Sequence, residues 1–372
     1  MAQVHPAPTS HADRIQSLDA LRGVAILGVL LAYTVWSLGN PPRDTWSRAD
    51  DVTAWLMDVF VDNKFVTIFA CAFGLGVSQQ WRRWQASGGD VPPLHLRRMT
   101  FLFVIGLLHG VFLRNGDILA PYALLGITLL LFRHVSSRIV GLAIVLLAAL
   151  PYAAEGVRIA MGWHWPARPE TSGVTSYVRE NVMWLRYWYV TNPVLSWPRI
   201  LALMLIGLLI GRAELVRRLA TDPPLARRVL FAALPLAVLT RVVYEALSRA
   251  WLDPPPDSAA AIALSALYQT SAWPLSASYA AALFLAWQFP AGVGALRPLT
   301  FVGRMAFTNY LLQSMIAVPI CLAFGWFDRV TPSGGVALAV VIALFQIAYS
   351  TWWLRRHAMG PFERLWRRAT YG

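Results

Sequence analysis

Residues 98–133 read RMTFLFVIGLLHGVFLRNGDILAPYALLGITLLLFR. An arginine stands at each end of this stretch, and only Asn115 and Gly116 separate its two apolar halves, 98–114 and 117–133. A bilayer core about 30 Å thick requires roughly 20 residues of helix, so each half is close to the length of one crossing. The stretch therefore predicts a tight hairpin of two transmembrane helices.

Further apolar stretches of similar length lie on both sides of this hairpin. Together they predict an all-α, polytopic membrane protein with about ten transmembrane helices. We expect one integral membrane domain over residues 1–372. The predicted spans are 21–38, 56–80, 98–114, 117–133, 138–155, 198–213, 228–248, 262–288, 300–326 and 335–354.

The composition supports the bilayer as the main partner of the chain. Apolar and aromatic residues make up 57% of it, and charged residues only 14%, against about 25% in soluble proteins. The net charge of +13 would suggest nucleic acid in a soluble protein. Here, however, the arginines lie in short clusters between apolar stretches, which is typical of cytoplasmic loops, so we expect no nucleic-acid partner.

The charges also predict the orientation. If the N-terminus is cytoplasmic and the loops alternate, about two thirds of the 32 basic residues lie inside, with about one third of the 19 acidic residues. Cytoplasmic loops carry an excess of Lys and Arg. We therefore expect both termini in the cytoplasm.

The best candidate for proton transfer is His109, near the outer end of the span 98–114. Asp117 opens the next span, and the NGD turn brings both residues to the same depth. A carboxylate orients an imidazole and raises its basicity, so the pair is a candidate catalytic site. The structural alternative is a histidine satisfied by hydrogen bonds between helices.

Two further candidates lie at the cytoplasmic ends of spans. Arg97 and Arg98 face Arg82 and Arg83 across a short loop, and guanidinium groups bind phosphates in a bidentate way, although a positive-inside cluster would look the same. Asp19 and Arg22 are three residues apart, so they can pair on one helical face. That pair is either a structural latch or part of a ligand site.

Other polar residues within the spans are candidate cavity-lining groups. Asp58 and Asp62 are four apart and would stack on one helical face, with Lys64 beside them; the alternative is snorkelling to the outer surface. Asn309 and Gln313 are also four apart and could line a cavity or bond between helices.

By the same spacing rule, we expect Arg241 and Glu245 to form a structural pair. The sequence has no zinc or nucleotide-binding motif, so we expect no metal and no tightly bound cofactor. An aromatic-rich segment, 156–197, separates the fifth and sixth predicted spans on the outer side. It is either an interfacial belt or a platform for a sugar ring.

Several of these stretches resemble the bacterial YeiB-like family, whose members carry a C-terminal domain of unknown function. The resemblance spans nearly the whole chain and implies a multi-pass protein of the bacterial inner membrane, with a role in transport sometimes suggested. The matching segments are RIQSLDALRG at 14–23, NKFVTIFACAFGLG at 63–76, GLLHGVFLRNGDILAPYALLG at 106–126, VGRMAFTNYLLQS at 302–314 and GPFERLWRRATYG at 360–372.

More distantly, the RxxSxDxxRG start is similar to that of transmembrane acyltransferases, including the lysosomal heparan-glucosaminide acetyltransferase and bacterial O-acyltransferases. The resemblance implies acyl-CoA as a cytoplasmic co-substrate and a small-molecule or glycan acceptor on the outer side. Those enzymes place a histidine in the first outer loop or at the outer end of the first helix. Here the loop 39–55 has no histidine and the helix end reads Ala32–Tyr33.

Three functional hypotheses follow. In the first, Arg97 and Arg98 hold the CoA phosphates while His109, oriented by Asp117, is the general base of an acyl transfer. In the second, the same His–Asp pair is the proton relay of a transporter or exporter of a small amphipathic solute. In the third, the chain is a non-catalytic scaffold or sensor. The substrate, the acyl chain and the oligomeric state stay open at this point.

Overall fold

A computed structural model describes residues 15–114, 116–163, 177–250, 254–255 and 257–371 of the chain. Helices make up nearly all of this part, and no β-strand occurs within it. The α-helices are α1 Gln16–Ala32, α2 Arg48–Phe60, α3 Lys64–Ala86, α4 Val91–Phe112, α5 Leu119–Thr128, α6 Ser137–Ala160, α7 Tyr177–Leu195, α8 Trp197–Arg212, α9 Leu215–Thr221, α10 Pro223–Ala250, α11 Ala259–Ala286, α12 Pro290–Arg304, α13 Ala306–Phe324, α14 Pro332–Leu354 and α15 Pro361–Tyr371. Three short segments, η1 Tyr33–Ser37, η2 Arg43–Thr45 and η3 Leu129–Phe132, are π- or 3₁₀-helical.

Many of these helices have the length and composition of membrane spans. Within the described residues, 7 helical segments are each long and apolar enough to span a membrane without a second helix. They are α1, α2 with α3, α4, α6, α10, α13 and α14. The pairs α7–α8 and α11–α12 bend by 62° and 117°, and the count rises to 9 if each pair is one span. The all-α, multi-pass prediction is therefore confirmed. The figure of ten spans stays a prediction, with the shorter apolar helix Leu119–Phe132 as the remaining candidate.

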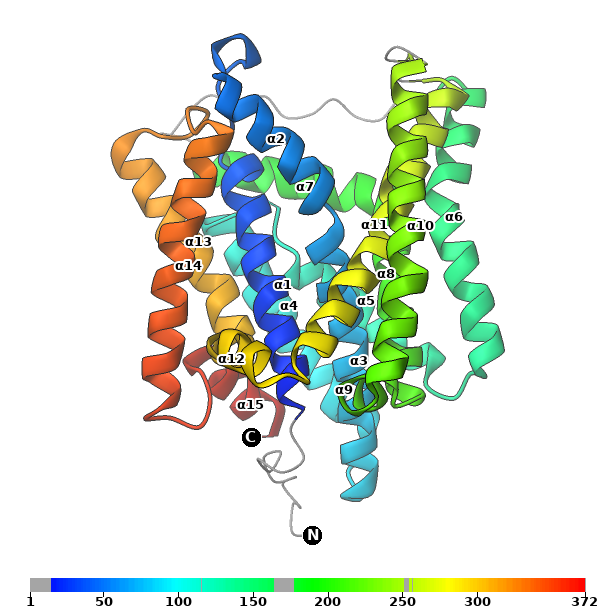
Figure 1. Cartoon of the computed structure of the whole chain (residues 1–372), viewed down its shortest axis with the longest axis vertical. Helices are drawn as coiled ribbons and strands as arrows, with labels where there is room; N and C mark the ends of the chain where they lie inside the picture. Colours follow the sequence, from blue (N-terminus) through cyan, green and yellow to red (C-terminus); the bar gives the residue numbers. More distant parts are fainter. Residues whose placement is uncertain (1–14, 115, 164–176, 251–253, 256, 372) are drawn as a thin grey trace.

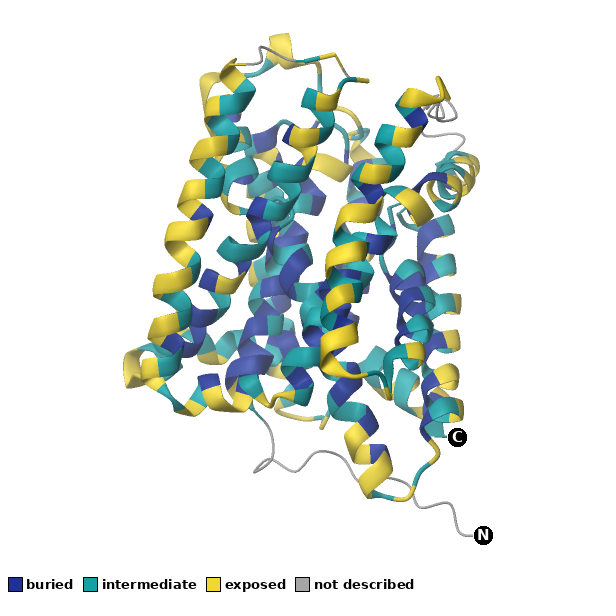
Figure 2. Cartoon of the chain, turned by 90° about the vertical axis from the view of Figure 1, so that its right-hand side faces the viewer, coloured by how far each residue is buried: buried dark blue, intermediate teal, exposed yellow. Residues whose placement is uncertain are grey.

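Burial separates a central helix from helices that face lipid. In α1, 72% of the most apolar window is buried against other helices, whereas the value is 11% in both α6 and α10. Large side chains such as Leu146 and Phe231 are exposed on these outer helices. Figure 2 faces that side and shows exposed residues along the outer faces and buried residues behind them. Such a surface requires an apolar solvent.

Two predicted spans are each broken in the structure. The span 56–80 divides between α2 and α3, where Asn63 adopts a left-handed backbone with φ of 64°, a conformation that asparagine tolerates better than most residues. The span 300–326 divides at Met305, between α12 and α13. The first break corrects the expected stacking of Asp58 and Asp62, because Asp58 is in α2 and Asp62 is in the turn that follows it.

The central helix α1 crosses α12 at a close contact that fixes one side of the interior. A Cβ atom added at Gly23 would lie 2.1 Å from the Leu299 carbonyl oxygen, and one added at Gly303 would lie 1.8 Å from the Asp19 oxygen. Small residues allow such close backbone packing between membrane helices. The contact holds the start of α1 against the α12–α13 break.

The two ends of the bundle differ. The start of α1 lies at the same end as α9, α12 and α15, and the α2–α3 turn and α7 lie toward the opposite end (Figure 1). By the charge pattern the first of these is the predicted cytoplasmic end. Of the aromatic segment 156–197, the second half forms most of α7, while 164–176, including Trp165, lies outside the described residues, as do Arg14 and Asn115.

Candidate functional site

A large pocket enters the bundle at the predicted cytoplasmic end. Its volume is about 1040 Å³, which is at the upper limit for small-molecule sites. Its walls come from α1, α3, α4, α5, α13 and α15, with the α8–α9 and α12–α13 junctions. Along α3 the lining residues run from Phe69 to Ser87, a distance of about 27 Å at 1.5 Å per residue. The pocket therefore reaches well into the membrane-spanning part.

The pocket is strongly basic. Seven arginines line it, against three carboxylates, so its field favours anionic ligands. Arg22 pairs with Asp19 at 3.5 Å, and Arg82 pairs with Glu214. Both members of the predicted Asp19–Arg22 pair thus lie in one site. The lining arginines are Arg22, Arg82, Arg83, Arg98, Arg217, Arg304 and Arg367.

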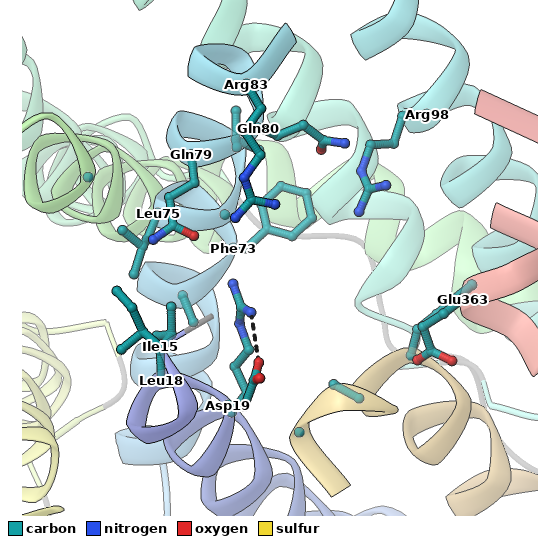
Figure 3. Close-up of a pocket in the computed structure, with 18 of the residues that line it drawn as sticks. Ile15, Leu18, Asp19, Phe73, Leu75, Gln79, Gln80, Arg83, Arg98 and Glu363 are labelled. Atoms are coloured by element: carbon teal, nitrogen blue, oxygen red, sulfur yellow. Dashed lines mark ion pairs between the residues drawn. The ribbon is translucent and has the colours of Figure 1, made fainter. Parts of the chain in front are cut away.

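The structure separates the two arginines that were expected to act together. Arg98 lines the pocket, while Arg97 is exposed and outside it, since consecutive helical residues point about 100° apart. The Arg98 guanidinium lies 3.4 Å from the Trp366 ring centroid, and the indole Nε1 of Trp366 donates to the Arg98 carbonyl at 2.9 Å. Figure 3 shows Arg83 and Arg98 pointing into the same space. Arg83 of α3 and Arg98 of α4 therefore face one space from two walls of the pocket.

A carboxylate from α15 completes the pocket, and the sequence analysis did not single it out. Glu363 accepts hydrogen bonds from the backbone N–H of Thr308, at 3.0 Å, and from the Thr308 hydroxyl. It therefore satisfies a donor in the first turn of α13, where a negative group is favoured. Burial raises the pKa of Glu363 above its ordinary value, and the bonds from Thr308 act in the opposite direction. The sequence signal that could have identified Glu363 is that it is the single acidic residue in the arginine-rich segment 360–372.

Beyond the inner end of the pocket lies the predicted His–Asp pair. The Nδ1 atom of His109 lies 2.9 Å from an oxygen of Asp117, and the other Asp117 oxygen accepts the backbone N–H of Ala120 at 2.9 Å. His109 and Asp117 are 3% and 8% exposed, so the pair is buried. The predicted contact is present.

The geometry fixes what the imidazole can do. In the neutral imidazole, a carboxylate that accepts at Nδ1 favours the tautomer with the proton on Nδ1 and the lone pair on Nε2. The Nε2 atom is buried and has no hydrogen-bond partner among the described residues. A buried, oriented acceptor of this kind can serve as a general base.

Tyr310 connects the pocket to the pair. Its side chain lines the pocket, and its hydroxyl donates to Asp117 at 3.2 Å. The backbone N–H of Ile118 donates to the same hydroxyl at 3.2 Å, and the Tyr310 ring centroid is 5.2 Å from that of His109. One aromatic side chain therefore separates the basic pocket from the His109–Asp117 pair. Sequence reasoning missed Tyr310, whose contact with Asp117 spans 193 residues.

The helix that covers the far end of α4 comes from the aromatic segment. Tyr177 and Asn181 of α7 donate to the carbonyls of Leu113 and Val111, at 2.7 Å and 3.0 Å. These carbonyls belong to the turn of chain just after His109. The α7 helix thus packs over the outer side of the buried pair.

Asn309 and Gln313 do not line the pocket. Asn309 donates to Ser350 at 2.9 Å and to the Val302 carbonyl at 3.1 Å, while Gln313 donates to the Ile26 carbonyl at 2.9 Å. Both are fully buried. Of the two expected roles, the contacts match hydrogen bonding between helices, here between α13 and its neighbours α1, α12 and α14.

Asp58, Asp62 and Lys64 lie away from the pocket, at the α2–α3 turn. Lys64 donates to the Asp58 carbonyl, and Asp58 pairs with Arg241, which also forms the predicted pair with Glu245. Asp62 accepts the indole N–H of Trp36 at 3.0 Å. The network ties the α2–α3 turn to α10. No group of three or more potential metal ligands occurs in the described part of the chain.

Comparison with known proteins shows which proteins the chain is similar to. Residues 210–372 match the family model "Protein of unknown function (DUF418)". The chain is 28% identical to the uncharacterized protein YxaH of Bacillus subtilis and 27% identical to the uncharacterized protein YeiB of Escherichia coli. The first alignment covers 98% of this chain and 96% of its relative, and the second 96% of each.

A 39.9 kDa protein of Bacillus acidopullulyticus is 26% identical, over 98% of this chain and 96% of that protein. The matched C-terminal region includes Tyr310 and Glu363, whereas His109 and Asp117 precede it. The similarity to these relatives covers the regions between the separate segments quoted from the sequence. Over nearly its whole length the chain is therefore similar to the uncharacterized YeiB and YxaH proteins, and its C-terminal part matches the family of unknown function DUF418.

Proposed function

We propose that the protein is a bacterial inner-membrane acyltransferase, which takes an acyl group from cytoplasmic acyl-CoA and transfers it to a hydroxyl group of a small-molecule or glycan acceptor on the outer side. One observation carries the proposal: a deep arginine-lined pocket ends at Tyr310, whose hydroxyl is bonded to the Asp117 that orients His109. A phosphorylated donor and a general base are the two components that such a reaction needs.

The arginine cluster suits the anionic part of CoA. Arginine presents a planar fork of donors that binds phosphate oxygens in a bidentate way, and its charge persists at any working pH. Arg83 and Arg98 face the same space from α3 and α4 (Figure 3). In this proposal they hold the phosphates, with Arg97 taking no part because it lies outside the pocket.

The transfer itself follows from the free nitrogen of His109. The Nε2 atom takes the proton of the acceptor hydroxyl as its oxygen attacks the thioester carbonyl carbon. A new C–O bond forms, the C–S bond breaks, and the CoA sulfur receives the proton from His109. Asp117 keeps the imidazole in the reactive tautomer throughout. Because Tyr310 separates the pocket from His109, its side chain must move aside for the thioester to reach Nε2.

Calorimetry of CoA binding to the purified protein tests the donor site. Loss of one charge-assisted contact costs about 1.5–3 kcal/mol, so Arg98→Ala should weaken binding by roughly 10- to 100-fold. Arg97→Ala is the matched control, since it removes the same charge from the neighbouring, exposed position, and it should bind within about threefold of the wild type. Equal affinities in both variants would remove the proposed phosphate site.

A second reading is a proton-coupled transporter or exporter of a small amphipathic solute. It is favoured by three separate ionisable pairs in the bundle, Asp19–Arg22, Asp117–His109 and Asp58–Arg241. Intramembrane groups of this kind often mark proton pathways. Proton-dependent flux in vesicles that Asp117→Asn abolishes would support this reading, while CoA binding without any flux would count against it.

A further inference from the structure

We infer that the donor carries a short acyl chain, in the range of acetyl to butyryl, because the pocket ends soon after the position that the thioester would reach. The inference rests on the proposed acyl-CoA site and deepens it. The inference comes from the order of polar and apolar lining residues along the pocket and from the length of the pocket.

Polar and apolar lining residues are separated by depth. On α3, the polar groups Gln79, Gln80, Arg82 and Arg83 lie toward the predicted cytoplasmic end, while Phe69 and Phe73 lie deeper. Helix α4 runs in the opposite direction and shows the same order, with Arg98 nearer that end than Leu102. The pocket thus has a basic mouth and an apolar inner end, which suits a ligand with a charged head and a less polar tail.

The length of the pocket can be compared with that of the donor. From Arg82 to Phe69 is about 20 Å along α3 at 1.5 Å per residue. The pantetheine arm has about a dozen bonds from its phosphate oxygen to its sulfur, and an extended chain covers roughly 3.5 Å per three bonds, so the arm spans about 14 Å. About 6 Å remain, enough for about two to five further bonds.

Two features make this remaining length of about 6 Å an upper limit. Figure 3 shows the Arg83 side chain extending along the pocket toward the level of Phe73, so a phosphate bound to it would start deeper. In the arrangement before Tyr310 moves aside, which is the one that the donor enters on binding, the inner end is also closed: Leu102, Leu119 and Tyr310 line it and are 2%, 5% and 1% exposed. Behind Tyr310 lies Asp117 rather than open space. A longer chain would have to displace packed side chains, which is unfavourable.

The test is a chain-length series measured by calorimetry on the whole protein in lipid nanodiscs. Acetyl-CoA and butyryl-CoA should bind within about threefold of each other, and octanoyl-CoA at least about tenfold more weakly, because it overfills the inner end. Leu119→Ala should recover most of the octanoyl-CoA affinity while acetyl-CoA binding is unchanged. Leu108→Ala, on the exposed face of α4, is the matched control and should change neither.

A second variant tests the path of the arm and does not depend on removing a core side chain. Gly76 lines the middle of the pocket, and among the described residues outside its own helix backbone and chain neighbours only an Arg22 nitrogen, at 3.4 Å, lies within 4 Å of a Cβ added there. Gly76→Leu should therefore project into the pocket and weaken acetyl-CoA binding at least about tenfold. Adenosine 3′,5′-bisphosphate keeps two of the three phosphates of CoA and lacks the arm, so its affinity for Gly76→Leu should be within about threefold of its affinity for the wild type.

The outcomes separate this inference from the function beneath it. Octanoyl-CoA binding as tightly as acetyl-CoA, or acetyl-CoA binding unaffected by Gly76→Leu, would overturn the short-chain inference and leave the CoA site in place. If neither CoA nor any acyl-CoA binds to the wild type, the proposed function itself is overturned.

Discussion

Glu363 is the position where a single change should affect both the pocket wall and the stability of the fold. Replacing it with alanine leaves two donors of Thr308, the backbone N–H and the hydroxyl, without their acceptor. Hydrogen bonds to a charged group contribute about 1.5–3 kcal/mol each. Burial already disfavours the carboxylate, so we take the lower end and expect a loss of about 3 kcal/mol. Gln retains one acceptor oxygen, and its loss should be about 1 kcal/mol.

The pH dependence gives this prediction a distinct signature. The pKa of Glu363 is raised above its ordinary value of 4.5, so the folded state binds the proton more tightly than the unfolded state. Its stabilising contribution is then complete below pH 4.5 and is lost as the pH rises through the folded-state pKa. Glu363→Gln removes this contribution. The advantage of the wild type over the Gln variant should therefore be larger at pH 5 than at pH 8.

Thermal unfolding of the detergent-solubilised protein at the two pH values measures both effects. For domains of 150–250 residues, 1 kcal/mol corresponds to about 2–4 °C, so a loss of about 3 kcal/mol would be about 6–12 °C there. The shift falls with size, so in this chain of 372 residues Glu363→Ala should lower the midpoint by roughly half as much, about 3–6 °C. Arg364→Ala is a suitable control, because Arg364 lies next to Glu363 in α15 but is exposed. The reasoning is refuted if Glu363→Ala unfolds at the wild-type temperature, or if the difference between wild type and Gln is independent of pH.

Three further changes have definite expected outcomes. Asp117→Asn should lower acyl transfer by about 10²- to 10⁴-fold, because the imidazole loses its fixed tautomer; unchanged turnover in folded protein would exclude His109 as the base. Gly106→Ala should destabilise the fold by about 1–3 kcal/mol in a denaturant titration, because the new Cβ would lie 2.3 Å from the backbone nitrogen of Ala120 and 2.8 Å from Asp117, whereas Gly141→Ala, with no atom within 4 Å, should be neutral or slightly stabilising. Arg241→Ala should cost about 1–3 kcal/mol in thermal unfolding, since it removes the cation shared by two half-buried carboxylates, and a midpoint equal to the wild type would show that the network contributes nothing.

Local spacing was enough to predict the contacts that a short segment of chain determines. The NGD turn places His109 and Asp117 at one depth, and eight residues of sequence contain all that the contact needs. The pair Arg241–Glu245 follows from one helical turn in the same way. Hydropathy likewise predicted the fold class, because the requirement for apolar helices in lipid is independent of how the helices are arranged.

Contacts between distant helices could not be obtained in this way. Tyr310 and Glu363 act on partners 193 and 55 residues away, and the sequence carries no rule that links them. The helix breaks at Asn63 and Met305 were missed because the apolar residues on both sides of each break were joined into one span, although Asn63 itself lies in a short polar run. Arg97 and Arg98 are adjacent letters of one basic cluster, and only the rotation of α4 decides which of them faces the pocket.

The position of α15 in the chain has a consequence for biosynthesis. Every candidate membrane span of the described chain precedes it, yet α15 supplies Glu363, Trp366 and Arg367 to the pocket wall and holds Arg98 through Trp366. The pocket is therefore incomplete while the spans are being inserted and forms only after α15 has emerged from the ribosome and docked. A pocket ligand added to cells would then rescue poorly folding variants only at this late step, and variants that fail during membrane insertion should not respond to it.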